Sequence, residues 1–129
     1  MPEIYLSRHG ESLYNKEDRL GGDPDLSDNG KKYSILLSEY VNNNNFDLVI
    51  TSGLKRTINT SKYIKCEKMT FPFLNEINAG ICENLTYEEV KKKYPEEFLK
   101  RKENKFIYRY PEGESYKDLV ERVKPIIEI

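Results

Sequence analysis

The sequence predicts an α/β fold, because short apolar runs typical of buried strands alternate with segments of helical periodicity. The apolar runs begin at Ile4, Phe46 and Met69, and capped or amphipathic helical segments lie after and between them. A chain of 129 residues suits one domain, and neither an internal repeat nor a linker interrupts it. We therefore expect a single domain over residues 1–129.

The first predicted strand ends in a cluster of chemically active residues. Ile4–Leu6 is expected to be a buried strand, and Arg8, His9 and Gly10 follow it at the carboxyl end, where open α/β sheets place their ligand sites. His9 is the only histidine of the chain. An arginine fork suits phosphate oxygens and an imidazole can act as a nucleophile, so the cluster favours chemistry over a histidine that only hydrogen-bonds within its loop.

A loop and a long helix follow. Residues 13–25 are rich in Gly, Asp and Asn and are predicted to be a loop, in which Gly21-Gly22 alone would indicate an ordinary turn. Ser27 is a plausible N-cap for the helix after it. The apolar stripe of that helix is predicted to face the core; its members are Tyr33, Leu36, Leu37, Tyr40 and Val41.

The second predicted strand, Phe46–Thr51, leads into a possible anion site. Ser52 can cap the next helix, and Arg56 falls in its first turn, where free N–H groups and a cation would be presented together. A cation is mildly unfavourable at that end of a helix, which indicates a bound anion. The commoner alternative for such an arginine is a solvated position on the surface.

The remaining elements are predicted from strand composition and helix caps. Met69–Leu74 is expected to be a third strand or extended run, with Glu76 just after it. Thr86 begins a capping-box pattern for a helix that Pro95 ends, and residues 95–104 are predicted to form another helix. Ser115 begins a second capping box, and the helix after it carries the apolar positions Tyr116, Leu119, Val120, Val123, Ile126 and Ile127.

Composition excludes several classes of protein. The net charge is -1, so no general field for nucleic acid is expected, and any phosphate ligand requires locally clustered cations. The sequence shows neither a signal-peptide pattern nor an apolar run long enough to span a membrane. Cys66 and Cys82 lack metal-like spacing and are interpreted as reduced thiols of a cytoplasmic protein, and no metal site or cofactor is predicted.

Several ordered blocks resemble one known family. Residues 8–12, Arg-His-Gly-Glu-Ser, resemble the signature of the histidine phosphatase superfamily, in its phosphoglycerate mutase-like branch. The blocks at residues 19–23, 55–58, 74–80, 94–98 and 109–116 are similar to those of fructose-2,6-bisphosphatase domains. The resemblance runs from end to end of the chain, and it implies a three-layer α/β/α sandwich with a mostly parallel sheet.

The resemblance also implies an activity and a set of site residues. It implies hydrolysis of the 2-phosphate of fructose 2,6-bisphosphate through a phosphohistidine, in the control of glycolysis and gluconeogenesis, with a small sugar bisphosphate as substrate. The matching catalytic positions are His9 as nucleophile, Glu76 as general acid, and Arg8 and Arg56 as phosphate ligands. The matching substrate-binding positions are Asn15 and Gly21 near the reacting phosphate, and Tyr87, Arg101, Lys105 and Tyr116 around the second phosphate.

The chain departs from the family pattern at its end. In the family, the final helix leads into a strand that supplies a second catalytic histidine and pairs beside the His9 strand, and no such residues follow Ile129. We therefore expect a C-terminally truncated domain, with uncovered apolar helix faces, low stability and reduced or no activity. A native, self-sufficient short form is the less favoured alternative. A kinase domain in a longer parent protein is a possible partner.

Two other functions stay open from the sequence. One is a catalytically silent module that binds phosphorylated ligands, although retention of Glu76 argues against it. The other is a phosphoglycerate mutase or a broad-specificity phosphatase, which the four second-phosphate positions disfavour.

Overall fold

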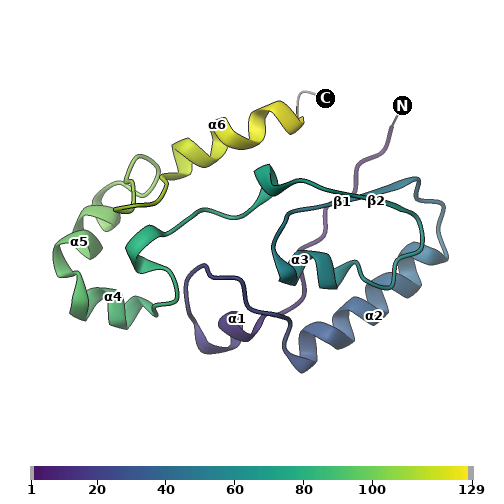
Figure 1. Cartoon of the computed structure of the whole chain (residues 1–129), viewed down its shortest axis with the longest axis horizontal. Helices are drawn as coiled ribbons and strands as arrows, with labels where there is room; N and C mark the ends of the chain where they lie inside the picture. Colours follow the sequence, from purple (N-terminus) through teal and green to yellow (C-terminus); the bar gives the residue numbers. More distant parts are fainter. Residues whose placement is uncertain (1, 128–129) are drawn as a thin grey trace.

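The computed structural model describes residues 2–127 and has a parallel pair of strands between helical layers. β1 (Leu48–Thr51) pairs with β2 (Glu67–Thr70), so that Leu48 lies opposite Glu67 and Thr51 opposite Thr70. Figure 1 shows α2 and α3 on one side of the strands and α6 on the other. The predicted α/β/α layering and the parallel pairing are both present.

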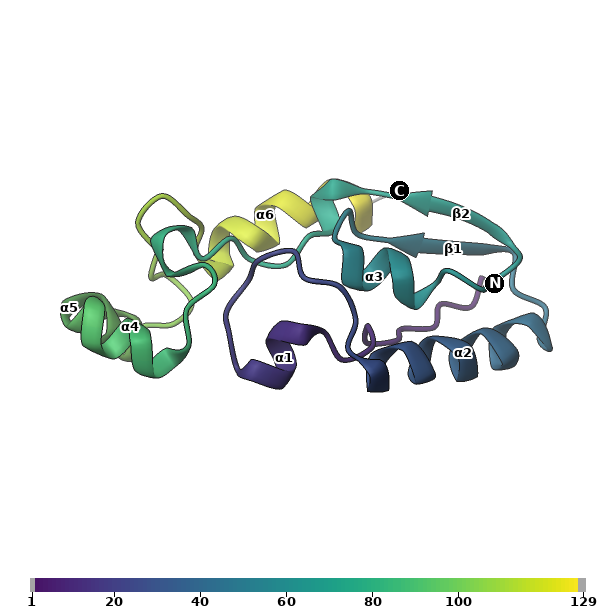
Figure 2. The same cartoon turned by 60° about the horizontal axis from the view of Figure 1, so that its bottom comes forward.

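The helices account for most of the regular structure. In chain order they are α1 (Leu13–Glu17), α2 (Asp28–Asn42), α3 (Lys55–Thr60), α4 (Tyr87–Lys93), α5 (Pro95–Glu103) and α6 (Tyr116–Ile127), with short 3₁₀ turns η1 (Pro72–Leu74) and η2 (Gly80–Cys82). In both views, α4 and α5 form a lobe at the opposite end of the molecule from α2, β1 and β2 (Figures 1 and 2).

Side-chain caps begin three of these helices where the sequence predicts them. The Ser27 hydroxyl accepts a hydrogen bond from Gly30 N at 3.2 Å, and the Thr86 hydroxyl accepts one from Glu89 N at 3.1 Å. Ser115 and Asp118 cap α6 reciprocally, each side chain accepting from the other's backbone N–H at 3.0 and 2.9 Å. Such caps satisfy backbone donors that the first helical turn leaves without partners.

The predicted first strand is wrong for this structure. Ile4–Leu6 is extended but pairs with no strand among the described residues, and the side chains of Ile4 and Leu6 are 84% and 95% exposed. A strand is defined by its ladder, so an apolar run without a neighbouring edge remains an isolated extended segment. Figure 2 shows this segment running apart from β1, on the side where α2 lies.

The prediction for the buried face of α2 is also wrong. The buried residues are Gly30, Ser34 and Ser38, whereas Leu36 and Tyr40 of the apolar stripe are exposed. The Ser34 and Ser38 hydroxyls donate to helical carbonyls three residues back, which satisfies them without a partner from another element. Helix α2 therefore packs against the rest of the protein through the face that carries its small residues. The expected uncovered apolar faces are present in part: Leu36 of α2 and Val120 of α6 are exposed, whereas Leu37 and Val123 are half-buried.

Two predicted boundaries are corrected. The expected loop of residues 13–25 begins with helix α1, because Ser12 and Asn15 form a capping box that the sequence interpretation overlooked. The third strand ends at Thr70, because Pro72 opens the 3₁₀ turn η1 and cannot donate to a ladder.

The buried apolar cluster lies in the lobe of α4 and α5. Ala79, Cys82, Val90 and Tyr110 are each at most 5% exposed and pack together. Partly buried side chains from α4, α5 and the flanking loops surround them, including Leu85, Tyr94 and Phe98. The lobe thus has a small core of its own.

Cys66 and Cys82 are both free thiols, and burial raises the pKa of the Cys82 thiol. Within residues 2–127, no helix combines the length and the apolar character needed to cross a membrane.

Candidate active site

His9 is held at the point where the N-terminal segment meets α2 and α3. Gly10 N donates to the Thr60 hydroxyl of α3 at 2.9 Å. A Cβ atom on Gly10 would lie 2.7 Å from the Gly30 carbonyl oxygen of α2, so the close approach of the two backbones requires glycine here. His9 Nδ1 lies 2.6 Å from the Gly10 carbonyl, which can only accept a hydrogen bond. This contact assigns the hydrogen to Nδ1 and leaves Nε2 as the nitrogen that faces the site.

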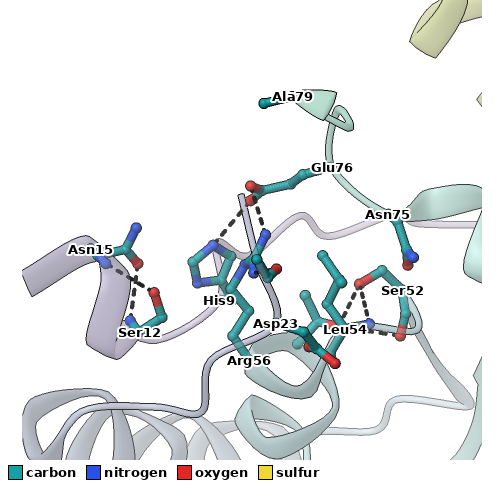
Figure 3. A network of polar contacts seen from close by, with 12 residues as sticks. His9, Ser12, Asn15, Asp23, Ser52, Leu54, Arg56, Asn75, Glu76 and Ala79 are labelled. Carbon is teal, nitrogen blue, oxygen red and sulfur yellow. Dashed lines mark hydrogen bonds and ion pairs between the residues drawn. The ribbon is translucent and has the colours of Figure 1, made fainter. Parts of the chain in front are cut away.

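Glu76 joins His9 to Arg56. Its Oε1 lies 3.2 Å from His9 Nε2, and its Oε2 accepts from the Arg56 guanidinium at 2.9 Å (Figure 3). Arg56 is 3% exposed and also donates to the Gly22 carbonyl at 3.1 Å. Residues from the N-terminal segment, from α3 and from the loop after η1 therefore meet at one carboxylate.

The Glu76 carboxyl group is strongly acidic in this arrangement. The His9 hydrogen bond, together with the charge and the hydrogen bond of Arg56, outweighs partial burial and lowers the pKa of Glu76 from 4.5 to about 2. Glu76 is consequently a carboxylate at neutral pH, and it occupies the donors that a bound anion would use.

Arg8 and Asn15 lie beside His9. Together with His9 and Glu11 they line a cavity of about 200 Å³. The amide oxygen of Asn15 accepts from Ser12 N at 3.0 Å as part of the α1 capping box. Asn15 therefore has a structural role in the unliganded protein, and its amide NH₂ group is left for other contacts.

Gly21 shapes the loop that holds Arg56. Gly21 and Gly22 have φ values of +57° and +66°, in the left-handed region that favours glycine. The Glu83 carboxylate packs against this turn, accepts from Gly22 N and also from Ala79 N at 2.9 Å. The structure thus gives Gly21-Gly22 the role of a turn that directs the Gly22 carbonyl at Arg56.

The predicted free N–H groups at the start of α3 are in fact occupied. Lys55 N donates to the Asp23 carboxylate at 2.7 Å, and Gly53 N donates to the Asn75 amide oxygen at 2.7 Å. Ser52 does not cap the helix as expected; its hydroxyl bonds Thr57 at 2.6 Å and accepts from Leu54 N. Of the predicted anion-site groups of α3, the Arg56 guanidinium is the one that contacts the other site residues.

The predicted second-phosphate residues meet only in part. The Arg101 guanidinium carbon lies 5.3 Å from the centre of the Tyr87 ring and 5.9 Å from that of Tyr110. Arg101 donates to the Tyr87 hydroxyl at 3.5 Å. Burial opposes the charge, but the neighbouring phenols of Tyr110, Tyr87 and Tyr116 raise the pKa of Arg101. Lys105 is exposed, and no hydrogen bond or ion pair of residues 2–127 involves its ammonium group. The structure gathers one cation and three phenols.

Sequence reasoning missed Asp23, Asn75, Glu83 and Tyr110. Asp23 lies in the predicted loop and Asn75 follows a predicted strand, where polar side chains are common. Only the folded structure shows that both accept hydrogen bonds from backbone N–H groups at the start of α3. Tyr110 is distinguished by burial, which raises the pKa of its phenol to about 12. In the described part of the chain, no group of three or more His, Cys, Asp or Glu side chains has a geometry that could hold a metal ion.

Comparison with known proteins gives consistent matches over nearly the whole chain. Residues 4–129 match the histidine phosphatase superfamily, branch 1. The chain is 51% identical over 126 residues to the 6-phosphofructo-2-kinase/fructose-2,6-bisphosphatase 3 of Homo sapiens, covering 96% of this chain and 24% of the relative. The chain spans about a quarter of the length of the curated relatives it matches.

Solved structures show the same fold. A crystal structure of TTHB049 from Thermus thermophilus has a TM-score of 0.73 at 29% identity, covering 94% of this chain and 68% of that one. A mycobacterial glucosyl-3-phosphoglycerate phosphatase has a TM-score of 0.78 at 24% identity, covering 93% and 59%. The second of these likenesses concerns the fold alone.

Proposed function

Because the chain belongs to the histidine phosphatase superfamily, branch 1, we propose that it transfers a phosphoryl group from fructose 2,6-bisphosphate to His9 and then to water. The observation that carries the proposal is the meeting of His9 Nε2, the Arg56 guanidinium and the Glu76 carboxylate within hydrogen-bond distance. The similarity to fructose-2,6-bisphosphatase regions supports the choice of substrate.

The geometry supports His9 as the nucleophile. In the unliganded protein His9 donates from Nδ1 to the Gly10 carbonyl and from Nε2 to Glu76. Transfer of the Nε2 proton to Glu76, as the phosphate displaces the carboxylate, leaves a neutral imidazole with a lone pair on Nε2 toward the phosphorus and a protonated Glu76. Attack of Nε2 on the 2-phosphorus forms the N–P bond while the P–O bond to the sugar breaks. Arg8 and Arg56 would stabilise charge on the non-reacting phosphate oxygens.

Glu76 is proposed to protonate the departing sugar oxygen. A phosphate dianion at Arg56 and His9 would compete with the carboxylate for both donors, whose contacts keep the pKa of Glu76 near 2. Once those contacts pass to the phosphate, the pKa rises and Glu76 can carry a proton to the leaving group. The same carboxylate can afterwards activate the water that releases phosphate from His9.

The lobe is proposed to hold the other phosphate. Arg101, with the phenols of Tyr87 and Tyr116, offers the charge and the donors for a dianion that is bound but not transferred. Lys105 is proposed to join them when the ligand is bound. In a longer parent protein the domain would accompany a kinase region, as the names of the relatives indicate, and a cytoplasmic location stays a prediction.

The test is direct labelling. Substrate carrying labelled phosphate at the 2-position should leave acid-labile label on the wild-type chain and none on His9→Ala. Since His9 is the only histidine, retention of label by His9→Ala would contradict the proposal. Binding measured by calorimetry without label or phosphate release would contradict it in favour of a silent binding module.

A further inference from the structure

The loop that carries Glu76 is clamped by two side chains from the C-terminal part of the chain. The Arg122 guanidinium of α6 donates to the Phe73 carbonyl at 2.6 Å and to the Glu76 carbonyl at 3.4 Å. It also forms a two-pronged ion pair with Glu114, at 2.8 and 3.1 Å. One guanidinium therefore fixes both the start of the loop and the backbone of Glu76 itself.

Glu114 completes the clamp on the far side of Glu76. Its Oε1 accepts from Asn78 N at 2.9 Å, and its backbone N–H donates to the Asn78 carbonyl at 2.8 Å. The Arg122 hydrogen bond lowers the pKa of Glu114, so the pair is ionised at neutral pH. The side chains of both residues are about one-fifth exposed, so solvent competes little for these contacts.

A third anchor lies on the other side of the loop. The Asn75 amide oxygen accepts from Gly53 N at 2.7 Å, which ties the residue before Glu76 to the turn that begins α3. The Glu76 backbone is thus fixed from α6 and from the β1–α3 turn, while its carboxylate reaches His9 and Arg56. A carboxylate that must give a proton to a leaving oxygen depends on such placement.

We infer that Arg122, together with Glu114, is a positioning residue that sets where the Glu76 carboxylate lies relative to His9. The inference rests on the proposed function only for its catalytic consequence, because the geometric part concerns the unliganded protein. Neither residue touches the reacting atoms. Their effect passes through the backbone of residues 73–78.

The geometric part is tested by the proton NMR signals of the single imidazole. Glu76→Gln removes the charge next to His9 Nε2 and gives a reference position for the ring C–H resonances. Arg122→Ala should move these resonances more than halfway to the Glu76→Gln position at the same pH. Arg109→Ala is the matched control, because Arg109 also forms an ion pair on α6, with Asp118, but does not contact the Glu76 loop; it should leave the signals at the wild-type position.

Wild-type His9 signals in a folded Arg122→Ala protein would overturn the inference. If that variant does not fold, Arg122→Lys replaces it. A lysine can keep the charge pair with Glu114, but its single ammonium cannot span both carbonyls. A shift of the His9 signals toward the Glu76→Gln position then supports the inference, and an unchanged spectrum overturns it.

The catalytic part is tested with two leaving groups. The sugar oxygen of fructose 2,6-bisphosphate needs a proton as it leaves, whereas p-nitrophenolate leaves without one. Arg122→Ala should lower kcat for the sugar substrate about tenfold and change kcat for p-nitrophenyl phosphate by less than about twofold. Equal losses on both substrates would overturn the catalytic part. Absence of turnover by the wild-type chain would overturn the proposed function, while the NMR experiment still decides the positioning.

Discussion

The two ends of the molecule are held together in different ways. The lobe of α4 and α5 buries Cys82, Val90 and Tyr110 in a small apolar core. At the other end, β1 and α2 leave large apolar side chains exposed, and the buried groups there include Ser34 and Arg56. The phosphate site thus depends on a polar network, whereas the proposed second-phosphate site stands on hydrophobic packing. Substitutions at the phosphate site should therefore remove hydrogen bonds and charge, whereas substitutions in the core of the lobe should remove buried apolar surface.

The largest effect on activity is expected from Arg56→Ala, in the polar network of the phosphate site. This substitution removes a proposed phosphate ligand, one of the two donors to the Glu76 carboxylate, and the donor to the Gly22 carbonyl. Loss of one such donor lowers kcat about 100- to 1,000-fold. Steady-state phosphate release measures the effect.

Lys55→Ala is the matched control for Arg56. Lys55 is the neighbouring exposed cation of α3, and its backbone N–H keeps its bond to Asp23 after the substitution. Its kcat should stay within about twofold of wild type. Equal losses in Lys55→Ala and Arg56→Ala would mean that net charge, and not the buried guanidinium, supports the site.

The next effect separates the lobe core from the exposed helix faces. Val90→Ala deletes two buried carbons and should lower the free energy of unfolding by about 2 kcal/mol. Val120→Ala makes the same change in helix α6, where the side chain is 52% exposed, and should cost less than about 1 kcal/mol. Urea unfolding measures both. Equal costs would show that the face of α6 is covered in solution.

A smaller effect should divide the predicted second-phosphate residues. Arg101 is already positioned against the Tyr87 and Tyr110 rings, whereas Lys105 is not. Arg101→Ala should raise KM for fructose 2,6-bisphosphate about tenfold or more and leave a small monophosphate substrate unaffected, since a charge-assisted contact contributes about 1.5–3 kcal/mol. Lys105→Ala should have a smaller effect on KM. The reverse order would mean that the ligand reorganises the lobe.

The sequence predicted features that depend on neighbouring residues, but not those that depend on which elements pack together. Caps and proline positions predicted the starts of α2, α4 and α5, because these signals act within a few residues. The apolar stripe of α2 and the strand at Ile4–Leu6 failed, because periodicity reports which residues are apolar and not whether another element covers them. His9, Arg56 and Glu76 were named by resemblance, and the structure brings them together. The contact of Arg122 with the Glu76 loop could not have been found, because the two carbonyls that it binds there lie 46 and 49 residues away along the chain.

The smallest effect concerns the contribution of Glu76, in the polar network of the phosphate site, to the stability of the folded protein at low pH. The pKa of Glu76 is about 2 in the folded protein and 4.5 when unperturbed, so the unfolded chain binds the proton more readily between these values. The stability that Glu76 contributes is therefore fully present above about pH 4.5 and is lost as the pH falls through about 2. Glu114 and Asp118 also have lowered pKa values, so the wild-type curve alone cannot isolate Glu76. The informative quantity is the difference in free energy of unfolding between wild type and Glu76→Gln, measured with urea from pH 6 to pH 2. That difference should shrink as the pH falls, and only modestly, because half of the Glu76 side chain is exposed and solvent screens the pair. A difference that stays constant over this range would show that the carboxylate does not bind His9 and Arg56 in the unliganded protein.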